Sequence, residues 1–345
     1  MNKQLLSAVS LLLLLEGCGG KTAVEAERNH ILVAGSSTVY PFTKAIADAF
    51  QAKHKSFAKP VVESTGTNAG FKAFCAGLGA QHPDLVDASR RMKLAELQEC
   101  RANGVDQVVE LQIGLDGLAF VQSASAPVIK LTRKELYEAI AARPYGQPNA
   151  TKRWNDVNPS LPDFPILFYG PPASSGTRDT LAELIMTGGC DTDGSIRTLK
   201  TQDERRYTDV CTTVRTDGPY VESGEDDAKT TMKLIVNPGA VGIVGYSFLE
   251  ENAKQLRGIP VNGVAPSNES IIKGTYPGAR PLFIYVKKAN AERAGLKEFL
   301  AEYMGAIGPE GRLAKLGLVP AAEATRTAVA RNATAMAALD ASKLE

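Results

Sequence analysis

The stretch Ser174-Ser175-Gly176-Thr177 lies between two segments of different character. The apolar run 164–169 precedes it and has the composition of a buried strand. Leu181, Leu184 and Ile185 follow at helical spacing. Small hydroxyl residues between a strand and a helix bring backbone N–H groups, hydroxyl donors and the positive end of the helix to one point. That combination suits an oxyanion.

Two earlier stretches have the same composition, Gly35-Ser36-Ser37-Thr38-Val39 and Gly66-Thr67-Asn68-Ala69-Gly70. Each follows an expected strand, over 30–34 and 60–64 respectively, and each precedes an expected helix. One such loop alone is more commonly a helix cap than a ligand contact. Three in one chain favour a shared binding site.

Strands and helices alternate along the chain. Further strands are expected over 84–89, 108–113, 116–121, 237–246 and 282–286, and further helices over 93–100, over 131–141 and from about 291. This alternation predicts an α/β fold with largely parallel sheets. Ligands of such sheets bind at the carboxyl ends of the strands, where the hydroxyl-rich loops lie.

Composition limits the classes of partner. At 345 residues the chain is long enough for two domains, and its hydrophobic fraction of 44% is ordinary for a globular protein. Its 39 Lys and Arg residues balance 38 Asp and Glu residues, so no basic field indicates nucleic acid as a partner.

The N-terminus has the features of an export signal over residues 1–17. Lys3 precedes an apolar run, 5–15, that is too short to span a bilayer. Leu15-Glu16-Gly17-Cys18 resembles a bacterial lipobox, in which cleavage leaves Cys18 as an acylated first residue. The alternative is an ordinary secretory signal followed by an unmodified Cys18. Residues 18–28 have the small, polar composition of a tether, so we expect membrane contact through a lipid anchor only.

Apart from Cys18, the chain has four cysteines, an even number that indicates disulfides in an exported protein. Three connectivities are open, and the pairs close in sequence, Cys75–Cys100 and Cys190–Cys211, are favoured. No two of the cysteines have Cys-x-x-Cys spacing, so we expect no metal site.

An enzyme is a weaker interpretation of the same loops. Ser175 does not lie in a Gly-x-Ser-x-Gly sequence, and the three histidines, which could supply a base, all precede residue 83. No Gly-Lys-Ser/Thr sequence of a nucleotide-binding loop follows the glycines. We therefore expect neither catalysis nor a cofactor.

Two arginines lie beside the loops, Arg90 and Arg178. A guanidinium group binds a tetrahedral oxyanion well through charge-assisted hydrogen bonds. The alternative is that either arginine forms a surface or inter-domain ion pair.

Taken together, the motifs resemble those of the periplasmic phosphate-binding proteins of ABC phosphate-uptake systems, the PstS family, and within it the SphX branch. The resemblance covers nearly all of the chain after the export signal, and the spacing of residues 75 and 100 is part of it. The matching stretches are 35–41, 66–75, 87–92, 116–118, 154–157, 175–179 and 237–246.

The resemblance implies a type II fold with two α/β lobes joined by two crossover strands. Lobe I would comprise residues 29–114 and 266–345, and lobe II residues 115–265. It also implies high-affinity binding of inorganic phosphate in the periplasm and delivery to the membrane subunits of an ABC permease.

By the same resemblance, the ligand would be held by donors from both lobes. Lobe I would contribute Ser37, Thr38, the backbone of Val39, and Thr67. Lobe II would contribute Ser175, Gly176 and Thr177.

The chain departs from the family pattern at two positions. Arg90 stands where some members have an aspartate that accepts the proton of hydrogen phosphate, and Pro171 stands where some have an arginine. The sequence thus leaves Arg90, with Arg178 as a second candidate, to supply positive charge, and Asp116 as the candidate proton acceptor. The alternative functions are binding of sulfate or another tetrahedral oxyanion, and a secreted phosphatase-like hydrolase.

Overall fold

The computed structural model describes residues 28–224 and 227–344. The expected export signal, Cys18 and all of the expected tether except Arg28 lie outside these residues. Within the described ranges, no helix is both long enough and apolar enough to cross a bilayer.

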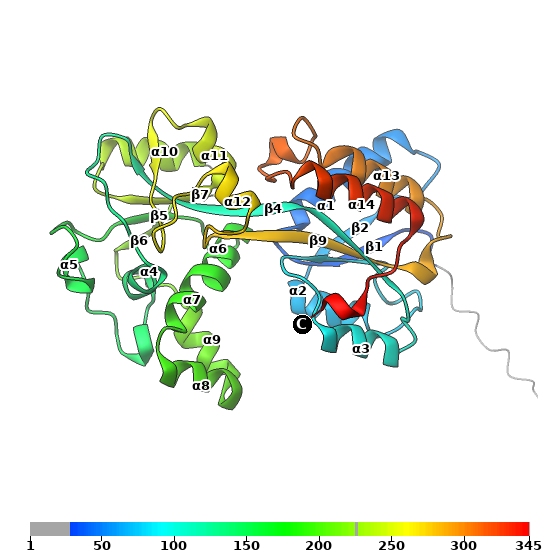
Figure 1. The fold of residues 1–345 in the computed structure, drawn as a ribbon, viewed down its shortest axis with the longest axis horizontal. Helices are drawn as coiled ribbons and strands as arrows, with labels where there is room; N and C mark the ends of the chain where they lie inside the picture. The colour runs from blue at the N-terminus through cyan, green and yellow to red at the C-terminus, as the bar shows by residue number, and fades with distance from the viewer. Residues whose placement is uncertain (1–27, 225–226, 345) are drawn as a thin grey trace, which may run out of the picture.

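Two lobes are joined by a pair of long strands, β4 (Val108–Ser123) and β9 (Ala279–Lys287), which confirms the expected two-lobed fold (Figure 1). The two strands pair antiparallel from Val108 opposite Lys287 to Gly117 opposite Ala279. The sequence predicted separate strands over 108–113 and 116–121. The register shifts between Gln112 and Gly114 without ending the pairing, so the structure has one strand there.

Lobe I is built around a sheet in which β1 (Leu32–Gly35) lies between β2 (Val61–Ser64) and β3 (Leu85–Ala88), with all three parallel. β3 then pairs antiparallel with β9. Apolar residues of one sheet face pack with α1 (Tyr40–Lys53), α13 (Leu296–Ala306) and α14 (Glu323–Ala335). The opposite face packs with α2 (Thr67–Phe74) and α3 (Leu94–Ala102) (Figure 1).

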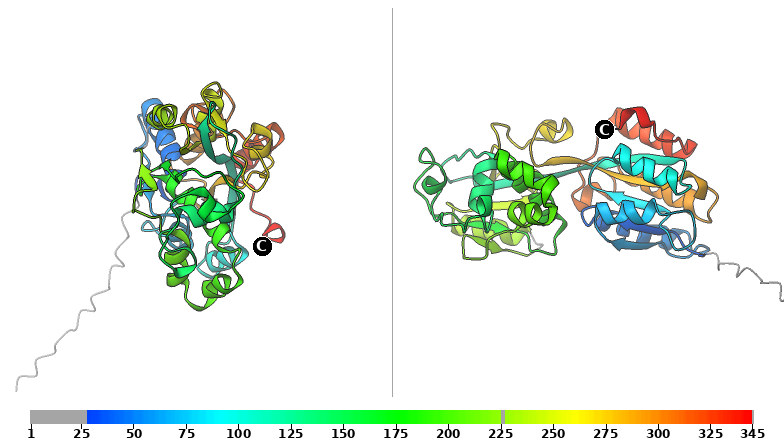
Figure 2. Two further views of the ribbon diagram at one scale, coloured as in Figure 1. Left: turned by 90° about the vertical axis from the view of Figure 1, so that its left-hand side faces the viewer. Right: turned by 90° about the horizontal axis from the view of Figure 1, so that it is seen from below.

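Lobe II continues the same sheet. β7 (Val241–Gly245) pairs antiparallel with β4 and parallel with β5 (Phe168–Gly170), which in turn is parallel to β6 (Tyr220–Glu222). β8 (Leu256–Gly258) pairs antiparallel with β4. The sheet therefore passes through both lobes, and the right-hand view in Figure 2 shows β4 and β9 spanning the space between them.

One apolar cluster holds the helices of lobe II around this part of the sheet. The segment 144–165 contains two short helical turns, η1 and α5. The helices of this lobe are α4 (Arg133–Ile140), η1 (Pro144–Gly146), α5 (Trp154–Val157), α6 (Gly176–Thr180), the π-helical segment η2 (Leu181–Met186), α7 (Thr187–Cys190), α8 (Gly194–Gln202), α9 (Glu204–Thr212), α10 (Asp227–Val236), α11 (Tyr246–Glu251) and α12 (Asn268–Ile272).

The segment before β9 packs with lobe II. Ile271 and Tyr276 are buried in the apolar cluster of that lobe, although the resemblance placed 266–345 in lobe I. We infer that the chain returns to lobe I within β9 rather than at residue 266.

Both favoured disulfides are present. Cys75 bonds to Cys100 between α2 and α3, with 4.0 Å between their Cα atoms. Cys190 bonds to Cys211 between α7 and α9, with a Cα–Cα distance of 5.5 Å. Each disulfide lies inside the apolar core of one lobe.

The core of lobe I contains a carboxyl group, that of Asp87 at the end of β3. Its Oδ1 accepts a hydrogen bond from the Thr43 hydroxyl at 2.9 Å, and that hydroxyl also contacts the Tyr303 hydroxyl at 2.8 Å. The Oδ2 atom is buried without a hydrogen-bond partner among the described residues. Burial raises the pKa of Asp87 to about 8, against the opposing effect of the Thr43 hydrogen bond. Asp87 is therefore mostly protonated near neutral pH.

This protonated acid makes the free energy of unfolding depend on pH. Between pH 4 and pH 8 the folded protein retains a proton on Asp87 that the unfolded chain has released. The contribution of Asp87 to the free energy of unfolding therefore falls as pH rises through this range, by up to about 1.4 kcal/mol per pH unit. The Asp87→Asn variant should lose this component, which denaturant titrations at several pH values would measure. Equal slopes for variant and wild type would show that Asp87 does not retain its proton.

Candidate functional site

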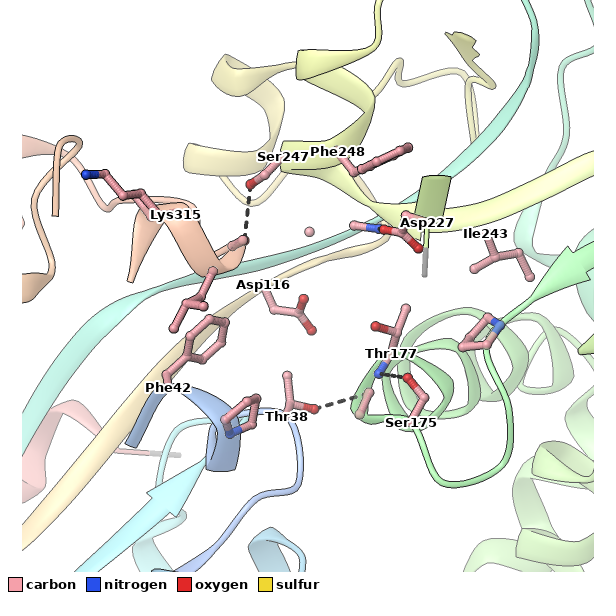
Figure 3. A pocket seen from close by; sticks show the side chains of 18 of the residues that line it. Thr38, Phe42, Asp116, Ser175, Thr177, Asp227, Ile243, Ser247, Phe248 and Lys315 are labelled. Atoms are coloured by element: carbon pink, nitrogen blue, oxygen red, sulfur yellow. Dashed lines mark hydrogen bonds between the residues drawn. The ribbon is translucent and has the colours of Figure 1, made fainter. Parts of the chain in front are cut away.

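A cleft of about 490 Å³ lies between the lobes (Figure 3). Ser37 and Thr38 line it from lobe I, the 175–177 loop lines it from lobe II, and Asp116 lines it from β4. Figure 3 shows the carboxyl group of Asp116 between Thr38 and Thr177. The structure thus brings two of the three hydroxyl-rich loops to one place.

The first loop is directed toward the cleft by a tight turn after β1. Gly35 has a positive φ of 141°, and a Cβ atom there would lie 2.1 Å from the carbonyl oxygen of Asp87. The Ser36 N–H donates to that same carbonyl oxygen at 2.9 Å, and the Tyr40 N–H donates to the Ser36 carbonyl at 2.9 Å. Only glycine allows so close an approach, so the turn holds Ser37 and Thr38 at the start of α1.

The second loop is organised by helix capping. Ser175 is the N-cap of α6, and its Oγ accepts a hydrogen bond from the Thr177 N–H at 3.2 Å. α6 runs on through the π-helical segment into α7, so this cap begins a continuous helical stretch. The positive end of that stretch and the hydroxyls of Ser175 and Thr177 face the cleft, an arrangement that favours a negatively charged ligand.

The two loops touch each other across the lobes. The Thr38 hydroxyl donates to the Gly176 carbonyl oxygen at 3.2 Å, and the Ser37 hydroxyl donates to the Asp179 carboxylate. A Cβ atom on Gly176 would lie 2.9 Å from the Cα atom of Thr38. The absence of a side chain at residue 176 is therefore what permits the contact between lobes.

A buried arginine that the sequence analysis did not select lies behind this contact. Arg280 on β9 donates from Nη2 to the Thr38 hydroxyl at 2.9 Å and to the Thr180 hydroxyl at 2.6 Å. Its guanidinium also forms ion pairs with Asp116, at 3.3 Å, and with Glu183. Nothing in the local sequence places Arg280 near Thr38. Two features of the sequence could have indicated Arg280. It directly precedes the apolar strand expected over 282–286, and Asp116, a residue of opposite charge, begins another expected strand that could pair with it.

Asp116 accepts hydrogen bonds on one of its two carboxylate oxygens. Oδ2 accepts from the Thr180 hydroxyl at 2.7 Å and from Nε of Arg280 at 3.3 Å. The side chain is 22% exposed and lines the cleft. Asp116 is thus placed where it could accept a proton from a ligand.

Thr67 and Arg90 do not line the cleft. The Thr67 hydroxyl contacts the Ser89 hydroxyl at 3.0 Å and accepts from the Ser89 N–H at 3.2 Å. Arg90 makes a two-pronged ion pair with Glu96, at 2.9 and 2.6 Å, and lies over the ring of Phe71. Its guanidinium is thus engaged within lobe I.

Arg178 does not line the cleft either. Its guanidinium donates to the Pro171 carbonyl oxygen at 2.9 Å and lies over the ring of Tyr220, 4.5 Å from the centroid. Pro171 itself lines the cleft, so Arg178 supports the loop that carries Ser175.

The remaining walls of the cleft come from residues that the sequence analysis did not name as ligand contacts. Lobe II contributes Asp227, whose Oδ2 accepts from the Gly245 N–H at 3.2 Å, together with Ile243 and Phe248. Lobe I contributes the turn η4 (Ala314–Leu316), and the carbonyl oxygen of the next residue, Gly317, accepts from the Ser247 hydroxyl at 3.1 Å (Figure 3).

Histidines and metal ions are the groups that a hydrolase most often uses to activate a nucleophile. None of the three histidines lines the cleft. Within the described residues, no group of three or more His, Cys, Asp or Glu side chains could hold a metal ion.

Comparison with known proteins agrees with this fold. Residues 20–306 match the model of the PBP superfamily domain, and the chain belongs to this superfamily. It is 32% identical over 303 residues to Protein SphX of Synechococcus elongatus, covering 86% of this chain and 78% of the relative. It is 28% identical to Phosphate-binding protein PstS of Staphylococcus epidermidis, covering 83% of this chain and 79% of that protein.

Among solved structures, the chain resembles a possible phosphate binding protein from Planctomyces limnophilus with a TM-score of 0.72 and 27% identity. The match covers 90% of this chain and 99% of the other. The staphylococcal relative is a phosphate-binding protein by name, and the planctomycete structure is named as a possible one.

The close approach at Gly176 can be tested with Gly176→Ala. The added methyl group would force the two loops apart by about 1 Å, because carbon atoms pack at about 3.5–4.0 Å. We expect faster amide hydrogen exchange in peptides covering residues 36–43 and 174–181.

Gly305→Ala in α13 is the matched control, since a Cβ atom there meets no other atom within 4 Å. Unchanged exchange in Gly176→Ala would show that the contact between the loops does not depend on glycine.

Proposed function

We propose that this protein binds inorganic phosphate outside the cytoplasmic membrane and delivers it to an ABC permease, without catalysing a reaction. The observation that carries the proposal is the meeting of two hydroxyl-rich helix starts, from opposite lobes, in one cleft. Relatives named as phosphate-binding proteins, matched over most of the chain, support it.

The proposed ligand contacts are hydroxyl and backbone donors at the two helix starts. They are those of Ser37 and Thr38 at α1 and of Ser175, Gly176 and Thr177 at α6, with the Val39 N–H as a further donor. Val39 does not itself line the cleft, and its N–H donates to Ser36 Oγ at 3.4 Å, a bond it would have to exchange for the anion. Thr38 now donates to a carbonyl oxygen at 3.2 Å, longer than is usual between a hydroxyl and an oxygen, so it could transfer this bond to an anion. Thr67 and Arg90 would join the site only by exchanging their bonds with Ser89 and Glu96 for bonds to the anion.

We propose Asp116 as the group that accepts the proton of hydrogen phosphate. An ionised carboxylate beside the ligand stabilises an anion that can donate a hydrogen bond and repels one that cannot. Sulfate has no proton to donate at neutral pH, so Asp116 would select against it. Without a proton acceptor the site would bind tetrahedral oxyanions in general. Binding of sulfate is therefore the alternative function.

We also propose that the protein is held at the membrane by lipid on Cys18. The support is the sequence around Cys18, which resembles a lipobox.

Mass spectrometry of the membrane fraction should detect an acylated N-terminal Cys18, and Cys18→Ser should move the protein to the soluble fraction. A wild-type protein that begins at another residue and carries no lipid would contradict the anchor.

The proposed function is tested by calorimetric titration of anion-free protein with phosphate and with sulfate, each at pH 6 and pH 8. We expect tight phosphate binding and no response to sulfate. In Asp116→Asn, phosphate binding should weaken by about tenfold and the preference over sulfate should shrink, because the ligand's proton has lost an ionised acceptor. Equal binding of both anions by the wild type, or no binding of either, would refute phosphate as the specific ligand.

A further inference from the structure

Arg280 is the side chain that connects both lobes with the strand pair between them. It lies on β9 opposite Asp116 on β4. Its guanidinium binds Thr38 of lobe I and, from lobe II, Thr180 and Glu183. The Arg280 side chain is only 6% exposed, so the guanidinium itself lies largely away from solvent.

We propose that Arg280 is the positioning residue of the anion site and that Glu183 is its exchangeable internal counter-ion. This inference rests on the proposed function. It assigns the positive charge of the site to a residue on the crossover strand, and it assigns to Glu183 the role of limiting anion affinity.

Arg280 sets the direction in which Thr38 can donate. Because Nη2 of Arg280 donates to the Thr38 oxygen, the hydroxyl proton of Thr38 must point elsewhere. It now points to the Gly176 carbonyl oxygen at 3.2 Å, on the wall of the cleft. A hydroxyl that accepts from a cation is polarised and becomes a stronger donor to an anion.

The other two arginines near the loops are already engaged. Arg90 is paired with Glu96, and Arg178 is bonded to the Pro171 carbonyl oxygen and stacked on Tyr220. Arg280, by contrast, contacts Thr38 and Asp116, which both line the cleft. Of these three arginines, Arg280 is therefore the one best placed to act on a bound anion, through Thr38 and Asp116, since it does not itself line the cleft.

The charges around Arg280 do not balance. One guanidinium faces two carboxylates, those of Asp116 and Glu183, so the cluster carries a net negative charge that opposes an incoming anion. The side chain of Glu183 is 55% exposed, whereas that of Asp116 is 22% exposed. Releasing Glu183 to water therefore costs less than releasing Asp116, which makes Glu183 the partner that an anion would displace.

The decisive variant is Glu183→Gln, titrated with inorganic phosphate in the full-length protein. Removing the competing charge should tighten phosphate binding by about threefold, as expected for a partly exposed charge. The same change removes an ion pair, so the melting temperature should not rise. If Glu183 had only a structural role, we would expect tighter phosphate binding only together with a higher melting temperature. Tighter binding at an unchanged or lower melting temperature therefore indicates that Glu183 competes with the anion.

Glu269→Gln is the matched control. Glu269 forms an exposed ion pair with Lys273 and does not line the cleft, so phosphate affinity should stay unchanged. Glu183→Gln that binds phosphate no more tightly than the wild type would overturn the inference.

Two substitutions of Arg280 test its own role. Arg280→Met removes the charge and should weaken phosphate binding by about tenfold or more. Arg280→Lys keeps the charge without the planar fork and should restore part of the loss. In a Thr38→Val background, Arg280→Met should cost less than in the wild type, because the residue through which Arg280 acts is gone.

The results separate this inference from the proposed function. Normal phosphate binding by the wild type, with the same affinity in Glu183→Gln and in Arg280→Met, would overturn the roles of Arg280 and Glu183 alone. Failure of the wild type to bind phosphate would overturn both.

Discussion

The antiparallel pairing of β4 with β9 is the constraint on which the rest of the structure depends. The two strands are the places where the described chain passes from one lobe to the other, and they are also the centre of a sheet that spans both lobes. Their register sets Asp116 opposite Arg280 at the level of the cleft. The hydroxyl-rich loops then meet around this ion pair, one from each lobe, so the backbone register determines the chemistry of the site.

The parts of the site that sequence could predict are those determined locally. The loops at 35–39 and 174–177 were found because a strand, a short run of small hydroxyl residues and a helix follow one another in the chain. The pattern of alternating strands and helices likewise predicted the α/β class. The cysteine pairing was predicted from proximity in the chain, and the structure has the same two bonds.

The parts that sequence could not predict depend on contacts between distant residues. Arg280 reaches Thr38 only because β9 pairs with β4, and a single sequence gives no sign of that register. Arg90 looked suitable because it follows an expected strand. Its actual partner, Glu96, also accepts from the Lys93 N–H at the start of α3, so the helix cap and the arginine share one carboxylate. The Glu96 carboxylate at this helix cap thus holds the Arg90 guanidinium within lobe I.

The two disulfides lie in separate lobes, and this separation has a mechanical consequence. Each bond stiffens its own lobe, between α2 and α3 in one and between α7 and α9 in the other. Neither of them bridges the gap between the lobes. Formation of the two disulfides therefore stiffens each lobe but leaves the joint between the lobes to strand pairing and side-chain contacts. A reducing environment would soften the lobes and leave the joint unaltered.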